Sequence, residues 1–375
     1  MSAPPVVLVD DAVATGAAAA LPAVWLDGCE VHTYPAGDLA AAAPESLAAA
    51  VALVARTMTR VDAALLERMP RLRAAATLSS GTDHLDLHAL AAREVALSTG
   101  RGGNAVAVAD WVEWALGRLR PGTLGAPGSL RSGTSGHLRP GPACRALVVG
   151  CGAVGEVVAD RLQGTGWQVV LCDPPRARRD ASFVSVDLDE AIDGGVDLIT
   201  MHTPLSREGA DATLGLLDAA RVDRLAGALL FNAARGGVVD EAAAGRARLS
   251  GRLVGLAIDT FVGEPRPSPA LVAAADLATA HVAGHSIEGK LRVAWLALCG
   301  LRRSLGLDDR LDLDAAIDAV VDALRASHAP ILDPGAVLDA ASRDLTAATA
   351  AGRGFTPLRN GHRRLEAGSP RLVVS

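Results

Sequence analysis

Three polar side chains in the second half of the chain lie in short motifs that contain glycine. The motifs are N-A-A-R-G at residues 232–236, G-E-P at 263–265 and H-V-A-G at 281–284. The guanidinium group of Arg235 is suited to bind a carboxylate through two hydrogen bonds and to polarise a neighbouring carbonyl. Histidine titrates near pH 6.5, so His281 could exchange a proton with a hydroxyl group while Glu264 fixes its tautomer. Each residue alone is more often a salt bridge or a satisfied core histidine.

The stretch from Arg145 to Pro175 predicts a βαβ unit that binds a dinucleotide. It has an apolar run at 146–149, the turn G-C-G-A-V-G at 150–155, an amphipathic stretch that ends near Gln163 and a second apolar run at 168–172. Gly150 permits the tight turn, Gly152 the approach of the pyrophosphate, and Gly155 close packing of helix on strand. The first N–H groups of the helix, at Ala153 and Val154, then face the phosphates. Three glycines alone would indicate only a loop, but the complete unit indicates dinucleotide binding.

The second run ends at Asp173, close to the expected spacing of about 20 residues after the glycines. A carboxylate there can accept from both ribose hydroxyls and repels a 2′-phosphate, which favours NAD over NADP. Three arginines follow, at positions 176, 178 and 179, and their positive charges would instead attract the 2′-phosphate of NADP. A hydride acceptor next to an anion clamp and an acid/base group implies oxidation of a hydroxy acid. Together with this unit, Arg235, Glu264 and His281 therefore indicate catalysis rather than structure.

The chain of 375 residues has a net charge of −6, which gives no electrostatic reason to expect nucleic acid as a partner. The first twenty residues lack a basic region, and no apolar run reaches the ~18 residues that span a bilayer. We therefore expect no secretory signal, no membrane partner and a cytoplasmic location. The five cysteines contain no C-x-x-C pair, which fits a reducing compartment. Cys151, inside the glycine turn, is either a small filler residue or a thiol whose modification blocks the cofactor.

The segment D-H-L-D-L-H at 83–88 resembles a metal cluster, but its two histidines have no clear third ligand elsewhere. We predict no metal site and expect Asp83 to serve in a turn and as a helix cap. Short apolar runs alternate with Ala-rich stretches in the first hundred residues, at 6–9, 30–34, 52–56, 73–78 and 94–98. This pattern predicts an α/β domain with a parallel sheet. Polar groups at 56–60 and 79–83 would lie at its carboxyl edge and form an anion cradle.

After Asp173 the alternation continues with predicted strands at 183–186, 198–202, 228–232 and 255–259. This repetition is typical of a doubly wound sheet with a ligand edge. A helix is expected at 287–305, and two more at 313–326 and 334–348. The Gly/Pro/Ser-rich segment 121–142 predicts a flexible loop, with an active-site lid as the alternative. The basic tail with alternating apolar residues predicts a short terminal domain.

At the three polar motifs the sequence resembles the D-isomer-specific 2-hydroxyacid dehydrogenases. The segments SSGTDHLD, NAVAVADWV, LCDPPRA, HTPLSREG and HVAGHSIEGK, together with the tail, are similar to the branch of that family that oxidises 4-phospho-D-erythronate in pyridoxal 5′-phosphate biosynthesis. The resemblance covers nearly the whole chain except 121–142. It implies NAD contacts from Asp173, Thr203, Asp259 and Gly284. It also implies substrate contacts from Thr57, Ser79 and His285, where the family usually has Ser, Thr and Tyr, and Ala280 stands where Pro is common.

The resemblance implies two doubly wound parallel-sheet α/β domains, a flavodoxin-like substrate domain and a Rossmann cofactor domain, plus a small C-terminal α+β domain that forms a homodimer. The expected ranges are 1–103 with 283–307 for the substrate domain, 104–282 for the NAD domain and 308–375 for the dimerisation domain. Two alternatives remain open. One is another D-2-hydroxyacid dehydrogenase, for example one acting on 3-phosphoglycerate. The other is a dinucleotide-sensing binding protein without catalytic activity.

Overall fold

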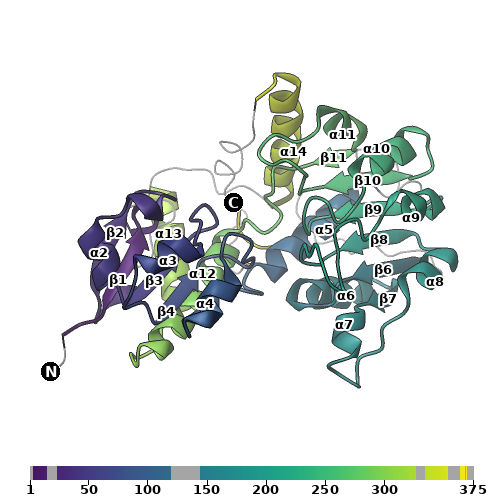
Figure 1. Cartoon of the computed structure of the whole chain (residues 1–375). Helices are drawn as coiled ribbons and strands as arrows, with labels where there is room; N and C mark the ends of the chain where they lie inside the picture. The colour runs from purple at the N-terminus through teal and green to yellow at the C-terminus, as the bar shows by residue number, and fades with distance from the viewer. Residues whose placement is uncertain are drawn as a thin grey trace. The chain divides into compact units, whose positions relative to one another are not determined.

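A computed structural model describes residues 3–14, 23–119, 144–326, 334–353, 364–367 and 369. The chain divides into two compact units, one of Met1–Asn104 with Ile287–Pro330 and one of Ala105–Ser286 with Ile331–Ser375 (Figure 1). The predicted loop at 121–142 lies outside the described residues. This division groups 308–330 with the first unit and 331–375 with the second, so a separate dimerisation domain stays a prediction.

The first unit contains a five-stranded parallel sheet in the order β2-β1-β3-β4-β5, as in the flavodoxin-like pattern. Every residue of β3 and β4 is buried, which explains why these strands read as continuous apolar runs without alternation. The strands are β1 Val6–Asp10, β2 Glu30–Tyr34, β3 Ala52–Ala55, β4 Ala74–Thr77 and β5 Ala96–Thr99. The prediction of a parallel α/β domain is confirmed.

Short helices connect these strands, and several begin at an aspartate whose side chain accepts from a backbone N–H of the first turn. The helices of the first unit are α1 Asp11–Ala14, η1 Ala23–Leu26, η2 Leu39–Ala41, α2 Pro44–Ala49, α3 Ala63–Glu67, α4 Leu87–Ala92, α12 Ile287–Ser304 and α13 Leu313–Ala326. Helix α12 packs on β4 and β5, and α13 packs on α12. The chain therefore returns to the first sheet after the second is complete.

The second unit contains a six-stranded parallel sheet in the order β11-β10-β9-β8-β6-β7. Its strands are β6 Arg145–Val149, β7 Gln168–Cys172, β8 Leu198–Met201, β9 Leu229–Asn232, β10 Gly255–Ile258 and β11 Leu277–Ala278. Alternate residues of β6 enter two cores, with Leu147 and Val149 in one and Ala146 and Val148 in the other. Helices thus cover both faces of the sheet, as the doubly wound prediction requires.

The helices of the second unit are α5 Ala105–Leu119, α6 Ala153–Gly164, α7 Pro174–Ala177, α8 Leu188–Asp193, α9 Ala219–Arg224, α10 Glu241–Leu249, α11 Pro269–Ala274 and α14 Pro334–Ala350. Helices α5, α6 and α14 contribute to the core that contains Val148, and α8, α10 and α11 to the core that contains Val149. The described part of 308–375 holds α13 and α14, both at their predicted positions.

The predicted strand at 183–186 is wrong. The segment runs beside the end of β7, where Val186 N donates to Leu171 O and the Ser185 hydroxyl accepts from Asp173 N. The Ser185 side chain thus takes the place of a backbone hydrogen bond of a β-ladder. Val184 is 79 % exposed, so the segment also lacks the buried face of a strand. The sheet consequently lacks the strand that would extend it beyond β7.

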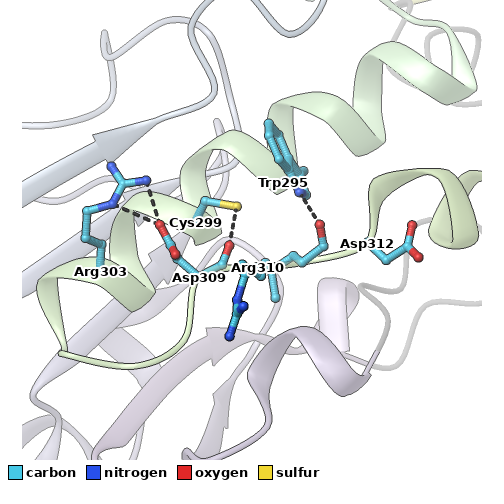
Figure 2. A pocket seen from close by; sticks show the side chains of 7 residues that line it. Trp295, Cys299, Arg303, Asp309, Arg310 and Asp312 are labelled. Carbon is cyan, nitrogen blue, oxygen red and sulfur yellow. Dashed lines mark hydrogen bonds and ion pairs between the residues drawn. The ribbon is translucent and has the colours of Figure 1, made fainter.

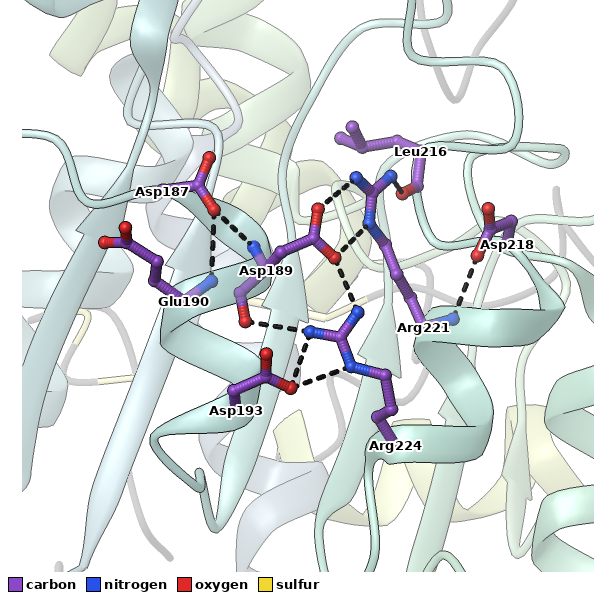
Figure 3. Close-up of polar contacts among 8 residues, drawn as sticks. All are labelled: Asp187, Asp189, Glu190, Asp193, Leu216, Asp218, Arg221 and Arg224. Carbon is purple, nitrogen blue, oxygen red and sulfur yellow. Dashed lines mark hydrogen bonds and ion pairs between the residues drawn. The ribbon is translucent and has the colours of Figure 1, made fainter.

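A surface ion-pair network joins α8 to α9 (Figure 3). The Asp189 carboxylate accepts from Arg221 at 2.6 Å and from Arg224 at 2.7 Å, and Arg224 also contacts Asp193. These hydrogen bonds, first from Arg221 and then from Arg224, lower the pKa of Asp189 to about 2. Because the network is solvent-exposed, water and salt screen its charges, and it adds little to the stability of the fold. It holds two helices together without contacting the predicted catalytic residues.

Within the described ranges, we find no helix with the length and hydropathy that a bilayer-spanning segment needs.

Candidate active site

The glycine turn has the close backbone packing that its sequence predicts. Gly150 has φ 87°, and a Cβ there would lie 2.8 Å from the His202 carbonyl group and the Thr203 methyl group. A Cβ at Gly155 would lie 2.0 Å from Gly150 O, so only glycine lets α6 start this close to β6. Gly152 is the N-cap of α6, and no side chain among the described residues caps this end of the helix. The first N–H groups of α6 can therefore serve an anion.

Polar atoms beside the turn also fit a bound dinucleotide. Among the described residues, the buried Thr203 Oγ1 and His202 Nδ1 have no hydrogen-bond partner. Burial lowers the pKa of His202 to about 3, and its Nε2 lies 2.9 Å from Thr200 Oγ1. Its neutral imidazole therefore adds no charge beside the turn. The Thr203 hydroxyl group is therefore available for a hydrogen bond to NAD. The NAD contact of Thr203 stays a prediction.

Asp173 closes the turn from the end of β7. One carboxylate oxygen accepts from Cys151 N at 2.8 Å, and the other accepts from Arg176 N at 2.9 Å and caps α7. A carboxylate oxygen has capacity for a second donor, so both oxygens can still accept from ribose hydroxyls. The structure thus places Asp173 beside the phosphate-binding turn, as its sequence position implied.

Two of the three arginines after Asp173 already have anionic partners. The Arg176 guanidinium lies 2.5 Å from Glu156 Oε1, donates to Cys151 O at 2.6 Å and stacks 4.3 Å from the Phe183 ring centroid. Arg178 is paired with Asp211. The charges that were expected to attract a 2′-phosphate are therefore largely compensated, which strengthens the preference for NAD.

His281 and Glu264 form a hydrogen-bonded pair. His281 Nδ1 lies 2.8 Å from Glu264 Oε2, and Glu264 Oε1 accepts from Phe261 N at 2.9 Å. The side chains are 28 % and 24 % exposed, so the pair is reachable yet largely shielded. With Nδ1 bound to the carboxylate, Nε2 is left for a substrate hydroxyl. The structure brings together the two residues that the sequence proposed as acid/base and orienting group.

Asp259 orders the loop that carries His281. Asp259 is 1 % exposed, and its carboxylate accepts from Thr279 Oγ1 at 2.6 Å, Val282 N at 2.8 Å and Ala283 N at 3.0 Å. Burial raises the pKa of Asp259, while His281 and these donors act in the opposite direction. His281 itself has φ 55°, a left-handed conformation that is uncommon outside glycine and that clusters at functional sites. Sequence reasoning missed this supporting role of Asp259, and its predicted NAD contact stays a prediction.

Arg235 lies in a tight loop after β9. Asn232 fixes the loop by accepting from Ala234 N and donating to Arg235 O, both at 3.1 Å. A Cβ at Gly236 would lie 2.1 Å from the Phe261 carbonyl carbon, so this loop packs directly on the segment that leads to Glu264. The N-A-A-R-G and G-E-P motifs are therefore neighbours in space, which explains the glycine after Arg235.

Comparisons with known proteins agree with this geometry. Residues 139–283 match the family model of the D-isomer specific 2-hydroxyacid dehydrogenase, NAD binding domain. The chain is 39 % identical to an erythronate-4-phosphate dehydrogenase of Salinibacter ruber, over 85 % of this chain and 83 % of that protein. It is also 39 % identical to the enzyme of that name from Aeromonas hydrophila, over 71 % of this chain and 67 % of the relative. The chain belongs to the D-isomer-specific 2-hydroxyacid dehydrogenases. It is an NAD-dependent oxidoreductase, as predicted.

Solved structures support the fold. A protein from Thermus thermophilus matches with a TM-score of 0.60 and 26 % identity, over 81 % of this chain and 98 % of that one. An NADPH-dependent glyoxylate/hydroxypyruvate reductase from Sinorhizobium meliloti, solved with NADP and malonate, matches with a TM-score of 0.62 at 21 % identity, over 80 % of this chain and 94 % of that one. These likenesses confirm two parallel-sheet α/β domains in a 2-hydroxyacid dehydrogenase.

The predicted substrate residues of this dehydrogenase lie on different units. Thr57 and Ser79 follow β3 and β4 of the first unit, and His285 lies in the second, close in sequence to His281. Thr57 is exposed, whereas the buried Ser79 hydroxyl already donates to Gly81 O at 2.6 Å and lies 2.8 Å from Thr77 Oγ1. Their substrate contacts stay predictions. The predicted anion cradle is partly neutralised, because Arg56 lies 3.6 Å from the buried carboxylate of Asp10.

The D-H-L-D-L-H segment has a structural role in its described contacts. His84 Nε2 lies 2.9 Å from Thr77 Oγ1, and burial lowers the pKa of His84. The capping residue of α4 is Asp86, which accepts from Ala89 N, so the expectation that Asp83 caps the helix is wrong. In the part of the chain that the structure describes, no three His, Cys, Asp or Glu side chains group as metal ligands.

Cys151 has the properties of a filler residue. It is 1 % exposed, and burial, followed by the charge of Asp173, raises its pKa to about 12. Thiolate is the reactive form, and its fraction at neutral pH is very small and grows only as the pH approaches that value. We therefore expect iodoacetamide at neutral pH to label half-exposed Cys144 well before Cys151 in peptide mapping by mass spectrometry. Equal labelling rates in the folded protein would contradict this and support a reactive cysteine in the turn.

The first unit also has a pocket of about 510 Å³ beside α12, lined by Trp295, Cys299, Arg303, Asp309, Arg310, Leu311 and Asp312 (Figure 2). Its walls are already joined to one another, since Trp295 Nε1 donates to Leu311 O at 2.7 Å and Arg303 pairs with Asp309 at 2.7 Å. The pocket contains none of the predicted catalytic or cofactor residues.

Proposed function

We propose that this dehydrogenase oxidises 4-phospho-D-erythronate to 3-hydroxy-2-oxo-4-phosphooxybutanoate with NAD, a step of pyridoxal 5′-phosphate biosynthesis. Relatives that carry the name erythronate-4-phosphate dehydrogenase, at 39 % identity, support this substrate. The observation that carries the chemistry is the 2.8 Å contact between His281 Nδ1 and Glu264 on a loop of the NAD-binding domain. It gives the site an oriented base whose other nitrogen is left for the substrate.

Each proposed catalytic residue has a distinct part in this reaction. Arg235 binds the substrate carboxylate and stabilises charge on the C2 oxygen, and His281 Nε2 accepts the C2 hydroxyl proton. Glu264 stabilises the imidazolium that results, through the Nδ1 hydrogen bond. The glycine turn, the start of α6 and Asp173 would hold NAD, which when bound would supply the acceptor for the C2 hydride. Gly284, a predicted cofactor contact, lies two residues after Val282. It therefore belongs to the loop that is ordered by the hydrogen bond from Val282 N to Asp259.

NADH formation measured with 4-phospho-D-erythronate, D-glycerate and 3-phosphoglycerate tests the substrate. We expect the highest kcat/KM with 4-phospho-D-erythronate. A higher value with 3-phosphoglycerate would favour the second candidate, another D-2-hydroxyacid dehydrogenase. That candidate has one observation on its side, the presence of His285 where the family usually has Tyr. Absence of turnover with all three, despite NAD binding, would favour a dinucleotide-sensing protein.

NAD is expected to bind much more tightly than NADP. Asp173 repels a 2′-phosphate, and Arg176 and Arg178 are engaged by Glu156 and Asp211. Asp173→Ala should narrow the difference between the two dissociation constants, measured by quenching of protein fluorescence. Arg224→Ala, in the exposed ion-pair network between α8 and α9, is the control and should leave the ratio nearly unchanged. Equal affinity for the two cofactors in the unaltered protein would show that Asp173 does not determine the preference for NAD over NADP.

We also propose that the enzyme is a homodimer in a reducing, cytoplasmic compartment. The apolar alternation of the tail and the resemblance at 308–375 support the dimer, and five free cysteines fit a reducing environment. Sedimentation of the full-length protein at micromolar concentration is expected to give the mass of two chains. A monomer under these conditions would contradict the proposal.

A further inference from the structure

A buried arginine from the C-terminal segment contacts the catalytic loop. The side chain of Arg364 is 1 % exposed and is among the largest fully buried side chains of the described residues. Its guanidinium group donates to Ala283 O at 2.6 Å and to Ala107 O at 2.9 Å. Ala283 is two residues after His281, and Ala107 is in the first turn of α5. Arg364 therefore joins a helix to the H-V-A-G motif.

The Ala283 residue is held from two directions. Its carbonyl oxygen accepts from Arg364, and its N–H donates to Asp259 at 3.0 Å. Asp259 in turn accepts from Val282 N, and its own carbonyl accepts from His281 N at 2.8 Å. The strained backbone of His281, with φ 55°, is thus fixed by Asp259 on one side and, through Ala283, by Arg364 on the other.

Acidic partners hold the arginine in place. Arg364 lies 3.4 Å from Asp110 of α5, which is 2 % exposed, and Asp110 also accepts from Arg161 of α6 at 2.7 Å. Ala367 N donates to Asp110 at 3.0 Å, and Ser286, just after the catalytic loop, donates to Glu366 at 3.2 Å. A charge buried this deeply is costly unless it is paired and hydrogen-bonded. Here Nη1 faces Asp110 and Nη2 donates to two carbonyls, while Nε has no hydrogen-bond partner among the described residues. The segment 364–367 therefore contacts α5 and, in the loop that follows His281, both Ala283 and Ser286.

We propose that Arg364 is a positioning residue for His281, and that the C-terminal segment thereby completes the active site of its own chain. This inference rests on the proposed function of His281 as the acid/base group. It predicts that loss of Arg364 impairs proton transfer more than cofactor binding. The glycine turn and Asp173 have no described contact with Arg364, and of the predicted NAD contacts Gly284 lies next to its partner Ala283. It also gives the tail a role separate from dimer formation.

The test compares Arg364→Met and Arg364→Lys with the unaltered full-length enzyme. Methionine keeps much of the side-chain volume but removes every donor. Lysine keeps the charge but lacks the planar guanidinium, whose Nη2 donates to both carbonyls while Nη1 faces Asp110. We expect kcat to fall by about 10²-fold in Arg364→Met, the size of effect that a displaced catalytic group can produce. The dissociation constant of NAD should change by less than about threefold, and Arg364→Lys should recover part of the rate.

Amide hydrogen exchange supplies a readout that does not depend on the substrate. Val282 and Ala283 amides should exchange faster in Arg364→Met, because the loop they belong to has lost one anchor. Asp339→Asn is the matched control: Asp339 on α14 accepts from Trp114 on α5 at 2.9 Å and also pairs with Arg118, but it has no described contact with the loop. This control should leave both kcat and loop exchange near their original values.

The outcomes separate the two proposals. Unchanged exchange at 282–283 together with an unchanged kcat in Arg364→Met would overturn the positioning role. If Arg364→Met fails to fold, Arg364→Lys decides through the same two readouts, and a lysine variant equal to the unaltered enzyme in both would overturn it. If the unaltered enzyme oxidises none of the hydroxy acids, the proposed function fails, while faster exchange in the variants would still establish the anchor.

Discussion

His281→Ala is expected to lower kcat for oxidation of the hydroxy acid by about 10²- to 10⁴-fold, the usual range for a positioned acid/base group. The variant loses the only side chain in the H-V-A-G motif that can accept the C2 hydroxyl proton. Binding of NAD should persist, because the glycine turn and Asp173 are unaltered. His88→Ala, at an exposed position on α4, is the control for a histidine substitution and should keep its rate.

The pH profile distinguishes proton transfer from a structural effect. A base must be neutral to accept a proton, so kcat/KM for oxidation should rise with pH, and kcat/KM for the reverse reaction should fall. In Glu264→Gln, the carboxylate that stabilises the imidazolium is absent, so the maximal rate of oxidation should fall. Near-normal turnover in a folded His281→Ala variant, verified by circular dichroism, would remove His281 from the mechanism.

The central parallel strands of both units could be predicted because their residues are buried on both faces. Such strands consist of apolar residues without interruption, as in β3, or with a single buried hydroxyl, as in β8, and they end at polar residues. The glycine turn was equally readable, since Gly150 and Gly155 are required by contacts only 2 to 3 Å from an added Cβ. Burial on both faces and close backbone contacts restrict which residue types can occupy a position, so they can be recognised from the sequence.

Other features depend on contacts between distant parts of the chain and leave no local trace. The segment 183–186 has apolar residues suited to a strand, but Ser185 replaces the ladder bond and Val184 faces solvent. Strand β11 has two residues, too few for a recognisable pattern. The alternating pattern of the basic tail predicts a terminal domain, but it does not show that Arg364 contacts Ala283, 81 positions away in the sequence. For Asp110 the sequence contains one indication of a buried ion pair, because it is an acidic residue on an otherwise apolar face of α5.

Arg235→Lys is expected to lower kcat/KM by about 10²-fold, although the charge is kept. A carboxylate and the adjacent C2 oxygen are best held by a planar group with several donors, and an ammonium group provides a point charge on a flexible stem. The Arg235 backbone is fixed by Asn232, and its loop packs on the Phe261 backbone at Gly236, so a lysine cannot gain reach by shifting the chain. The deficit should therefore appear in both KM for the hydroxy acid and kcat.

Arg224→Lys is the matched control, because Arg224 also contacts carboxylates but lies in the exposed network between α8 and α9. It should leave both constants near their original values. The comparison uses initial rates of NADH formation at saturating NAD, so cofactor affinity does not contribute. If Arg235→Lys has the kcat/KM of Arg224→Lys, the fork of Arg235 does not engage the substrate, and the carboxylate must be bound elsewhere. If only KM rises, Arg235 binds substrate and transition state equally and does not polarise the C2 carbonyl.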